Sequence, residues 1–198
     1  MNRVSLTVLL AICCEISMAQ AQSPPTPAEL GVIADHHLHL RTAVDIRAMV
    51  DFNKNLVEEL RDPAIDENMP VISAADLIAQ LDQAGIKHGT VLSAAYFFGM
   101  PEYEKSDEER LEKTQELNNL VAKEVAQYPH RLRAFCGVNP LSSFAIEEVT
   151  RCAEDLGMDG VKVHFANSNV NLIDPGHLAR LQQFFEGVRS LDLPVALH

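Results

Sequence analysis

The sequence is poor in positive charge. Lysine and arginine together number 16, against 28 aspartate and glutamate residues, and the formal net charge at pH 7 is −12. No stretch gathers lysine and arginine into the basic stripe that is typical of nucleic-acid-binding proteins. The composition therefore argues against a nucleic-acid partner, while the acidic excess favours solubility without defining a substrate.

The sequence also offers little that could span a membrane. Its N-terminal apolar run, Val4–Cys14, is too short to cross a bilayer. Arg3 precedes this run and small residues follow it at Ala19 and Ala21, which predicts a secretory signal peptide over residues 1–21. An N-terminal anchor or a misassigned start is the alternative. We expect a secreted or periplasmic protein with no stable membrane span once the signal is removed.

A proline-rich linker is expected over residues 22–31, after the signal peptide. Cysteine is scarce beyond that point, where Cys136 and Cys152 are the two that remain. Two cysteines in an exported protein could form a disulfide. Because Cys136 falls in an expected strand and Cys152 in the following helix, the pattern favours two buried free thiols.

Apolar runs and amphipathic stretches alternate from residue 32 onward. This alternation predicts right-handed βαβ units and a parallel sheet. No glycine-rich phosphate loop follows the first strand, so a dinucleotide-binding sheet has less support. The expected strands are 32–40, 86–95, 131–138, 160–165 and 193–198, and the expected helices are 73–84, 106–128, 144–156 and 174–190.

The segment 41–72 breaks this rhythm because it is far longer than the usual connection between a strand and its helix. Such an excursion usually serves function or carries its own secondary structure. We expect one or two short helices over residues 45–60, and we expect the segment to lie over the carboxyl end of the sheet.

Histidines mark the first expected strand. Side chains alternate between the faces of a strand, so Asp35, His37 and His39 are expected on one face and His36 on the other. Two imidazoles on one face can bind a single Zn²⁺, which accepts nitrogen ligands. Parallel barrels place catalytic residues at the carboxyl ends of their strands. The pair His37 and His39 is therefore a candidate metal site, although this short pattern also arises by chance.

Later strands bring polar groups to the same end of the sheet. Lys162 and His164 alternate with valines, so they are expected to face away from the helices. A buried Lys162 paired with a carboxylate such as Asp35 is the competing interpretation. His198 lies on the fifth strand and is a candidate third metal ligand.

Three consecutive aromatic residues, Tyr96, Phe97 and Phe98, follow the second strand. They could form an aromatic wall of a substrate site, although we expect at least one of them to pack beneath the segment 41–72 instead. Three further histidines are interpreted as surface residues: His88, His130 and His177.

Longer motifs carry a resemblance to a known family. Residues 32–39, V-I-A-D-H-H-L-H, resemble the first-strand metal motif of the amidohydrolase superfamily. Residues 131–140, 159–164 and 193–198 resemble the third, fourth and fifth strands of its amidohydrolase-related branch, which includes the aminocarboxymuconate-semialdehyde decarboxylase-like enzymes. The resemblance covers residues 32–198.

The resemblance implies an α/β fold, a (β/α)₈ TIM barrel of which about the first five strands are present. It implies a divalent metal, with Zn²⁺ as the expected ion, held by His37, His39 and His198. The branch completes its site with an aspartate after the eighth strand, and often with a histidine after the sixth, which lie outside this sequence. Residues implied to contact the substrate or to support the ligands are Asp35, Tyr96, Phe97, Phe98, Lys162 and His164. Lys162 is also a lower-ranked candidate for the carboxylated lysine that bridges two metals elsewhere in the superfamily.

The function implied is metal-dependent hydrolysis of a C–N or C–O bond of a small molecule through a metal-activated water. A non-oxidative decarboxylase of a small aromatic or unsaturated carboxylic acid is the first alternative. A catalytically inactive fragment or a binding module is the second. Because a barrel of this type usually needs ~250 residues, we expect the chain to be the N-terminal portion of a longer protein, with the general base in the missing part. Self-association into a homo-oligomer stays open.

Overall fold

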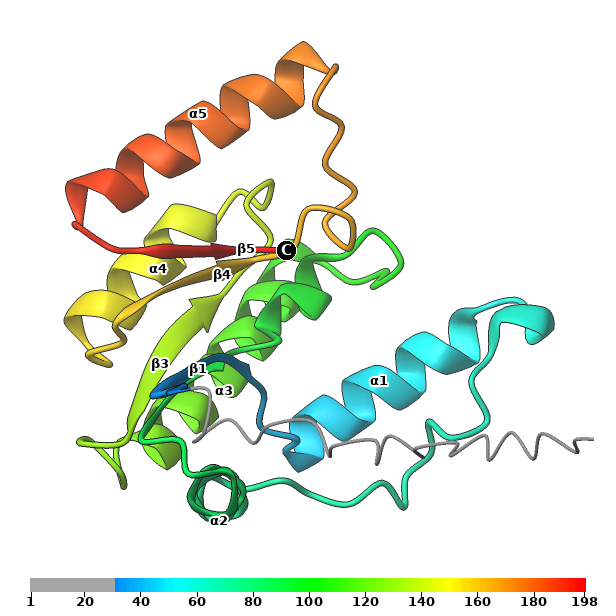
Figure 1. The fold of residues 1–198 in the computed structure, drawn as a ribbon. Coiled ribbons are helices and arrows are strands. Elements are labelled where there is room, and N and C mark those ends of the chain that lie inside the picture. Colours follow the sequence, from blue (N-terminus) through cyan, green and yellow to red (C-terminus); the bar gives the residue numbers. More distant parts are fainter. Residues whose placement is uncertain (1–30) are drawn as a thin grey trace, which may run out of the picture.

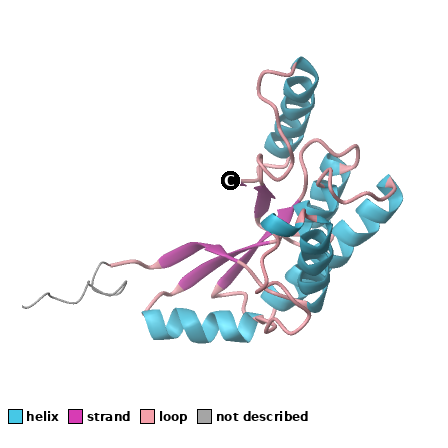
Figure 2. Cartoon of the chain, turned by 90° about the vertical axis from the view of Figure 1, so that its right-hand side faces the viewer, coloured by secondary structure: helices cyan, strands magenta, loops and turns pink. Residues whose placement is uncertain are grey.

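One parallel sheet organises residues 31–198, the part of the chain that the computed structural model describes. The predicted signal peptide and residues 22–30 of the linker lie outside the described residues. The strands are β1 (Ala34–Leu38), β2 (His88–Leu92), β3 (Leu132–Gly137), β4 (Gly160–Val163) and β5 (Val195–Leu197). They pair in the order β1-β2-β3-β4-β5 and curl into half of a barrel (Figure 2), which confirms the predicted partial TIM barrel.

Helices separate the strands as the alternation predicts. The helices are α1 (Ala43–Asn55), α2 (Ala74–Ala84), α3 (Asp107–Val125), α4 (Ala145–Glu154) and α5 (Pro175–Ser190), with short 3₁₀ helices η1 (Glu58–Leu60) and η2 (Ala95–Gly99). The expected helical content of 41–72 is therefore confirmed, and Figure 1 shows α1 on the carboxyl-end side of the sheet. Within residues 31–198, no helix combines the length and apolarity needed to cross a membrane.

Side chains at the helix ends explain where the helices begin and stop. Ser73 and Asp76 form a reciprocal capping box at the start of α2, and Ser106 and Glu109 form another at the start of α3. Each box satisfies backbone N–H groups that have no partner within the helix. At the end of α2, Gly85 adopts φ 72°, a left-handed conformation that glycine accepts without steric cost.

The core lies between the sheet and its helices. Val91, Ala134, Val161 and Val163 point from successive strands into this layer and are at most 4% exposed. A methyl group on Gly89 would meet Leu81 of α2, among others, so β2 approaches its helix closely. Because helices bury this face, polar strand residues such as Lys162 must occupy the opposite, concave face.

Strand β1 contains an irregularity that the alternation rule does not foresee. Asp35 pairs with Gly89, while Leu38 pairs with Val91, so three steps along β1 match two steps along β2. One extra residue in β1 is the pattern of a β-bulge, which shifts the side chains that follow it. The prediction that His36 points away from the concave face is wrong in this respect: its Nδ1 lies 3.1 Å from the Thr90 Oγ1 of β2.

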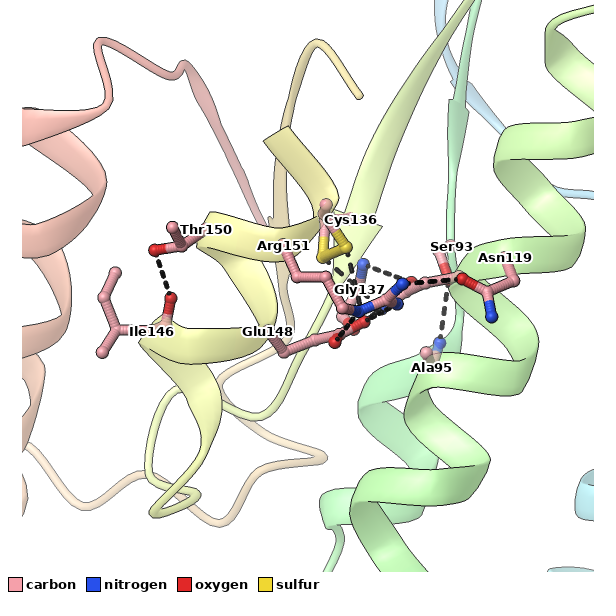
Figure 3. The surroundings of a disulfide bond; sticks show 11 residues. Ser93, Ala95, Asn119, Cys136, Gly137, Ile146, Glu148, Thr150 and Arg151 are labelled. Carbon is pink, nitrogen blue, oxygen red and sulfur yellow. Dashed lines mark hydrogen bonds and ion pairs between the residues drawn. A yellow bond between two sulfur atoms is a disulfide. The ribbon is translucent and has the colours of Figure 1, made fainter. Parts of the chain in front are cut away.

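Cys136 and Cys152 form a disulfide between β3 and α4, with 6.1 Å between their Cα atoms. The prediction of burial is correct, since each is 1% exposed, but the prediction of free thiols is wrong. The bond lies beside Glu148, which is fully buried and accepts two hydrogen bonds of 2.8 Å from Arg151 (Figure 3). Asn118 also donates to Glu148 over 2.8 Å, so the buried carboxylate is satisfied from two helices.

Reducing the disulfide should destabilise the fold. The bond closes a loop with a sequence separation of 16, for which the loss of unfolded-state entropy is worth ~3 kcal/mol. We expect dithiothreitol to lower the free energy of unfolding in urea by about that amount. The control is the variant that replaces both Cys136 and Cys152 with alanine, whose stability should not respond to the reductant. Recovery of two free thiols by peptide mass spectrometry of the unreduced protein would contradict the disulfide.

Candidate active site

Two imidazoles from the end of β1 converge at the carboxyl edge of the sheet. The Nε2 atoms of His37 and His39 lie 3.1 Å apart. Two nitrogens that each lie about 2.1 Å from one Zn²⁺ can be at most about 4.2 Å apart, so this pair fits a shared ion. The Nδ1 of His39 lies 2.8 Å from the carbonyl oxygen of Leu92 and donates to it, which leaves Nε2 as a lone-pair donor. Metal-binding histidines are oriented by such a hydrogen bond from their second nitrogen.

Further rings extend this pair into a continuous cluster across the sheet. The ring centroid of His198, which follows β5, lies 5.4 Å from that of His37 and 4.4 Å from that of His164. The ring of Tyr96 lies 5.3 Å from that of His164. The structure therefore brings together the three predicted ligands and two of the predicted substrate-facing residues.

His198, the third predicted ligand, does not lie within 4.8 Å of both other histidines as measured between possible ligand atoms. Among residues 31–198, the one group of three candidate ligands whose donor atoms all lie within 4.8 Å is Cys136, Glu148 and Cys152. Those cysteines are committed to the disulfide, and Glu148 is held by Arg151. The histidine cluster thus has two converged nitrogens, with His198 adjacent.

Lys162 occupies the concave face beneath the histidines and is 1% exposed. Burial lowers the pKa of both His37 and His39, and the charge of Lys162 adds to this effect. No carboxylate within residues 31–198 lies within 4.0 Å of its Nζ. The alternative in which Lys162 pairs with Asp35 is therefore not what the structure shows.

The remaining predicted residues separate into those near the cluster and those outside it. Asp35 accepts a 2.9 Å hydrogen bond from the backbone N–H of His37 and supports the end of β1. The ring of Phe97 is tilted against that of Tyr96, with 4.8 Å between their centroids. Phe98 packs on Tyr103 in the core and contributes no wall to the site. Phe98 is therefore a structural residue, although the ring that it contacts is Tyr103 and not one from the segment 41–72.

One residue that affects Tyr96 of the candidate site was not predicted from the sequence. Asp45, at the start of α1, is 4% exposed and raises the pKa of Tyr96, although burial is the larger cause of a shift to about 12. Its carboxylate accepts from the backbone N–H of Thr42 over 2.7 Å in a capping box. The Thr42–Asp45 spacing is the sequence signal that could have located this helix start.

Burial governs the protonation of the histidines. It is the first cause of a lowered pKa at His37, His39 and His164, and the neighbouring Lys162 and His198 add to the shift. Burial also lowers the pKa of Lys162. The shifts at His37, His39 and His164 favour the neutral imidazole, which is the form that binds metal.

The whole described sheet matches one family model. The model for the family described as amidohydrolase aligns with residues 34–198. The chain belongs to the amidohydrolase family. This confirms the resemblance of the strand motifs to the amidohydrolase-related branch, and no curated protein sequence matches the chain significantly.

Solved structures share the fold at low sequence identity. A 5-carboxyvanillate decarboxylase from Novosphingobium aromaticivorans superposes with a TM-score of 0.65 at 14% identity, over 89% of this chain and 53% of that one. A 2,6-dihydroxybenzoate decarboxylase from Rhizobium gives 0.55 at 22% identity, over 84% and 49%. A probable 2-pyrone-4,6-dicarboxylic acid hydrolase from Acinetobacter baumannii gives 0.50 at 21% identity, over 84% and 49%.

These likenesses establish the fold alone, and the chain spans about half the length of each solved structure it matches. The 5-carboxyvanillate decarboxylase was solved with bound manganese. So was a dihydroxybenzoic acid decarboxylase from Polaromonas.

The lowered pKa of His39 should be measurable by NMR. We expect its imidazole to titrate below about 6.5, the value for an unperturbed histidine. Because the folded state resists protonation at this site, its stabilising contribution is complete above about pH 6.5 and is lost as pH falls. The His39→Gln variant should show a shallower loss of unfolding free energy between neutral and mildly acidic pH. A His39 midpoint equal to or above that of the urea-unfolded chain would contradict the expected direction.

Proposed function

We propose that His37, His39 and His198 hold a divalent metal in an active site of this amidohydrolase. The hydrogen bond from His39 Nδ1 to Leu92 carries the proposal, because it directs the free Nε2 toward the Nε2 of His37. Imidazole ligands suit Zn²⁺, which we expect, while the two manganese-containing decarboxylases make Mn²⁺ the competing ion. When bound, the ion would act as a Lewis acid on a substrate oxygen.

We propose a small carboxylic acid as the substrate. Lys162 supplies a buried positive charge with no carboxylate partner in the described chain, and a substrate carboxylate would satisfy it. His164 Nδ1 accepts a 3.1 Å hydrogen bond from the backbone N–H of Asn167, so the neutral ring carries its proton on Nε2. His164 is therefore suited to donate a hydrogen bond to the substrate. Tyr96 and Phe97 would pack against its apolar part.

Non-oxidative decarboxylation is the reaction that we favour. Lys162 and His164 would orient the carboxylate beside the metal-binding histidines. Decarboxylases are prominent among the solved structures that share the fold, which supports this choice.

Hydrolysis of a C–N or C–O bond is the second candidate, and the probable hydrolase among the structural relatives supports it. Hydrolysis needs a general base for water, which we place in a part of the enzyme outside this sequence. Carbon dioxide release from a panel of hydroxybenzoates, set against hydrolysis of esters and lactones, distinguishes the two reactions. Turnover of neither class with metal present would favour the third reading, an inactive fragment or binding module.

We also propose that the mature protein is exported and acts on a small molecule, with self-association left to experiment. Residues 1–21 would be removed on export. N-terminal sequencing of the secreted protein tests this proposal, and an intact Met1 in the mature protein would refute it.

Removing a metal-binding histidine should remove the metal. We expect His37→Ala and His39→Ala each to weaken metal affinity by about 100-fold or more, since loss of a supporting hydrogen bond alone costs 10- to 100-fold. Elemental analysis and activity of the purified protein measure the effect. His88→Ala is the matched control, because His88 is exposed at the opposite end of β2. Full metal content in both variants would refute the assignment.

Lys162 should affect substrate binding through its charge. We expect Lys162→Met, which keeps the length of the side chain, to raise KM for a carboxylic acid substrate about tenfold or more. Lys162→Arg should recover part of the lost affinity, because it restores the charge but not the shape. An unchanged KM in Lys162→Met, with normal folding by circular dichroism, would exclude contact between this ammonium group and the substrate.

A further inference from the structure

A cavity lies outside the histidine cluster, among the loops that follow β2, β3 and β4. Its volume is about 320 Å³. Six of its lining residues carry the argument: Arg110, Arg180, Asp107, Ser143, Ser168 and His177. Asp107 and Arg110 lie at the start of α3, and His177 and Arg180 lie in the first two turns of α5. Ser143 and Ser168 lie in the loops that follow β3 and β4.

Two guanidinium groups face this cavity without an acidic partner. Neither Arg110 nor Arg180 has a carboxylate within 4.0 Å among residues 31–198, although acidic residues outnumber basic ones in this sequence. Instead, backbone carbonyls hold them in place. Arg110 donates from Nε to Lys105 and from Nη1 to Met100, and Arg180 donates from Nη1 to Leu141. The Nη2 of each makes no hydrogen bond within the described part of the chain.

The acidic group on the cavity wall is already engaged. Asp107 accepts a 2.8 Å hydrogen bond from the hydroxyl of Ser143. It also lies in the first turn of α3, where the partial positive charge of the helix N-terminus offsets a carboxylate. Two arginine charges therefore face one compensated carboxylate, and the cavity has an excess of positive charge.

Two further polar groups on the wall lack a complete set of partners. Ser168 is 2% exposed, and its Oγ has no hydrogen-bond partner among residues 31–198. Such a buried, unsatisfied hydroxyl calls for a water or a ligand group. His177 Nδ1 accepts a 3.0 Å hydrogen bond from the backbone N–H of Asn171, so the neutral ring carries its proton on Nε2. Its interpretation as a surface residue is corrected to half-buried.

We propose that this cavity binds a small oxyanion, a carboxylate or a phosphate, between Arg110 and Arg180. Guanidinium groups match the paired oxygens of both chemistries, and the serine and histidine donors would satisfy the remaining oxygens. The volume lies at the small end of the range for ligand pockets, so the cavity suits a small ligand.

This site would also touch the candidate active site through one loop. The backbone N–H of Ser168 donates over 2.9 Å to the carbonyl of His164. Asn167, between them in sequence, donates to the His164 ring. An anion at the arginine pair would therefore hold the loop that orients His164, without contacting the histidine cluster itself.

Isothermal titration of the full chain with inorganic phosphate, and separately with malonate, tests the proposal. We expect millimolar or tighter binding of at least one anion. Arg110→Gln and Arg180→Gln should each weaken it about tenfold or more, because a charge-assisted hydrogen bond is lost. Arg180→Lys should retain part of the affinity. Arg189→Gln is the matched control, since it removes an equal charge from the far end of the same helix. Preference for phosphate or for malonate identifies the source of the oxyanion.

The competing outcomes are distinct. Binding that survives in both Arg110→Gln and Arg180→Gln would overturn the proposal, as would the absence of binding by either anion. Binding lost in His37→Ala but kept in Arg180→Gln would place the anion at the histidine cluster and would also overturn it. Normal circular dichroism and thermal unfolding of Arg180→Gln are required, and Ser168→Ala provides a second test through a milder loss of affinity without a change in charge.

Discussion

The burial of one face of the sheet is the constraint on which the other features depend. Helices cover the face formed by Val91, Ala134, Val161 and Val163, and this face admits no unpaired polar side chain. Lys162 and the histidines must therefore lie on the concave face or at the carboxyl ends of the strands. The parallel order of the strands then brings residues from β1, β4 and β5 to one edge. The packing of the sheet alone therefore gathers these side chains at the carboxyl ends of the strands, without any contribution from a metal or a substrate.

Hydrogen bonds to single ring nitrogens divide the roles within that cluster. His39 uses Nδ1 as a donor to Leu92, so its Nε2 offers a lone pair. His164 uses Nδ1 as an acceptor from Asn167, so its Nε2 offers a proton. The free ring nitrogens of these two histidines therefore have opposite hydrogen-bonding chemistry. One is suited to a metal and the other to a substrate oxygen, although both belong to the same cluster of rings.

The sequence predicts the elements well because their signals are local. The capping pairs Ser73–Asp76 and Ser106–Glu109 set two helix starts, and the valines beside Lys162 set the facing of β4. The bulge in β1 is different, because it depends on how β1 pairs with β2 and leaves no mark in its own residues. Alternation therefore misplaced His36 while it correctly grouped His37 with His39.

The disulfide and the arginine cavity also depend on contacts between distant parts of the chain, which the sequence does not reveal. Whether Cys136 and Cys152 pair depends on the approach of α4 to β3, which brings their Cα atoms to 6.1 Å, and sequence spacing does not encode this distance. Arg110 and Arg180 lie in different helices and become neighbours on one cavity only through the loops after β2, β3 and β4. Neither arginine has a carboxylate partner among the described residues, although acidic residues outnumber basic ones in the sequence. Hydrogen bonds to backbone carbonyls hold both guanidinium groups in place without neutralising them, so their charge stays available to a ligand.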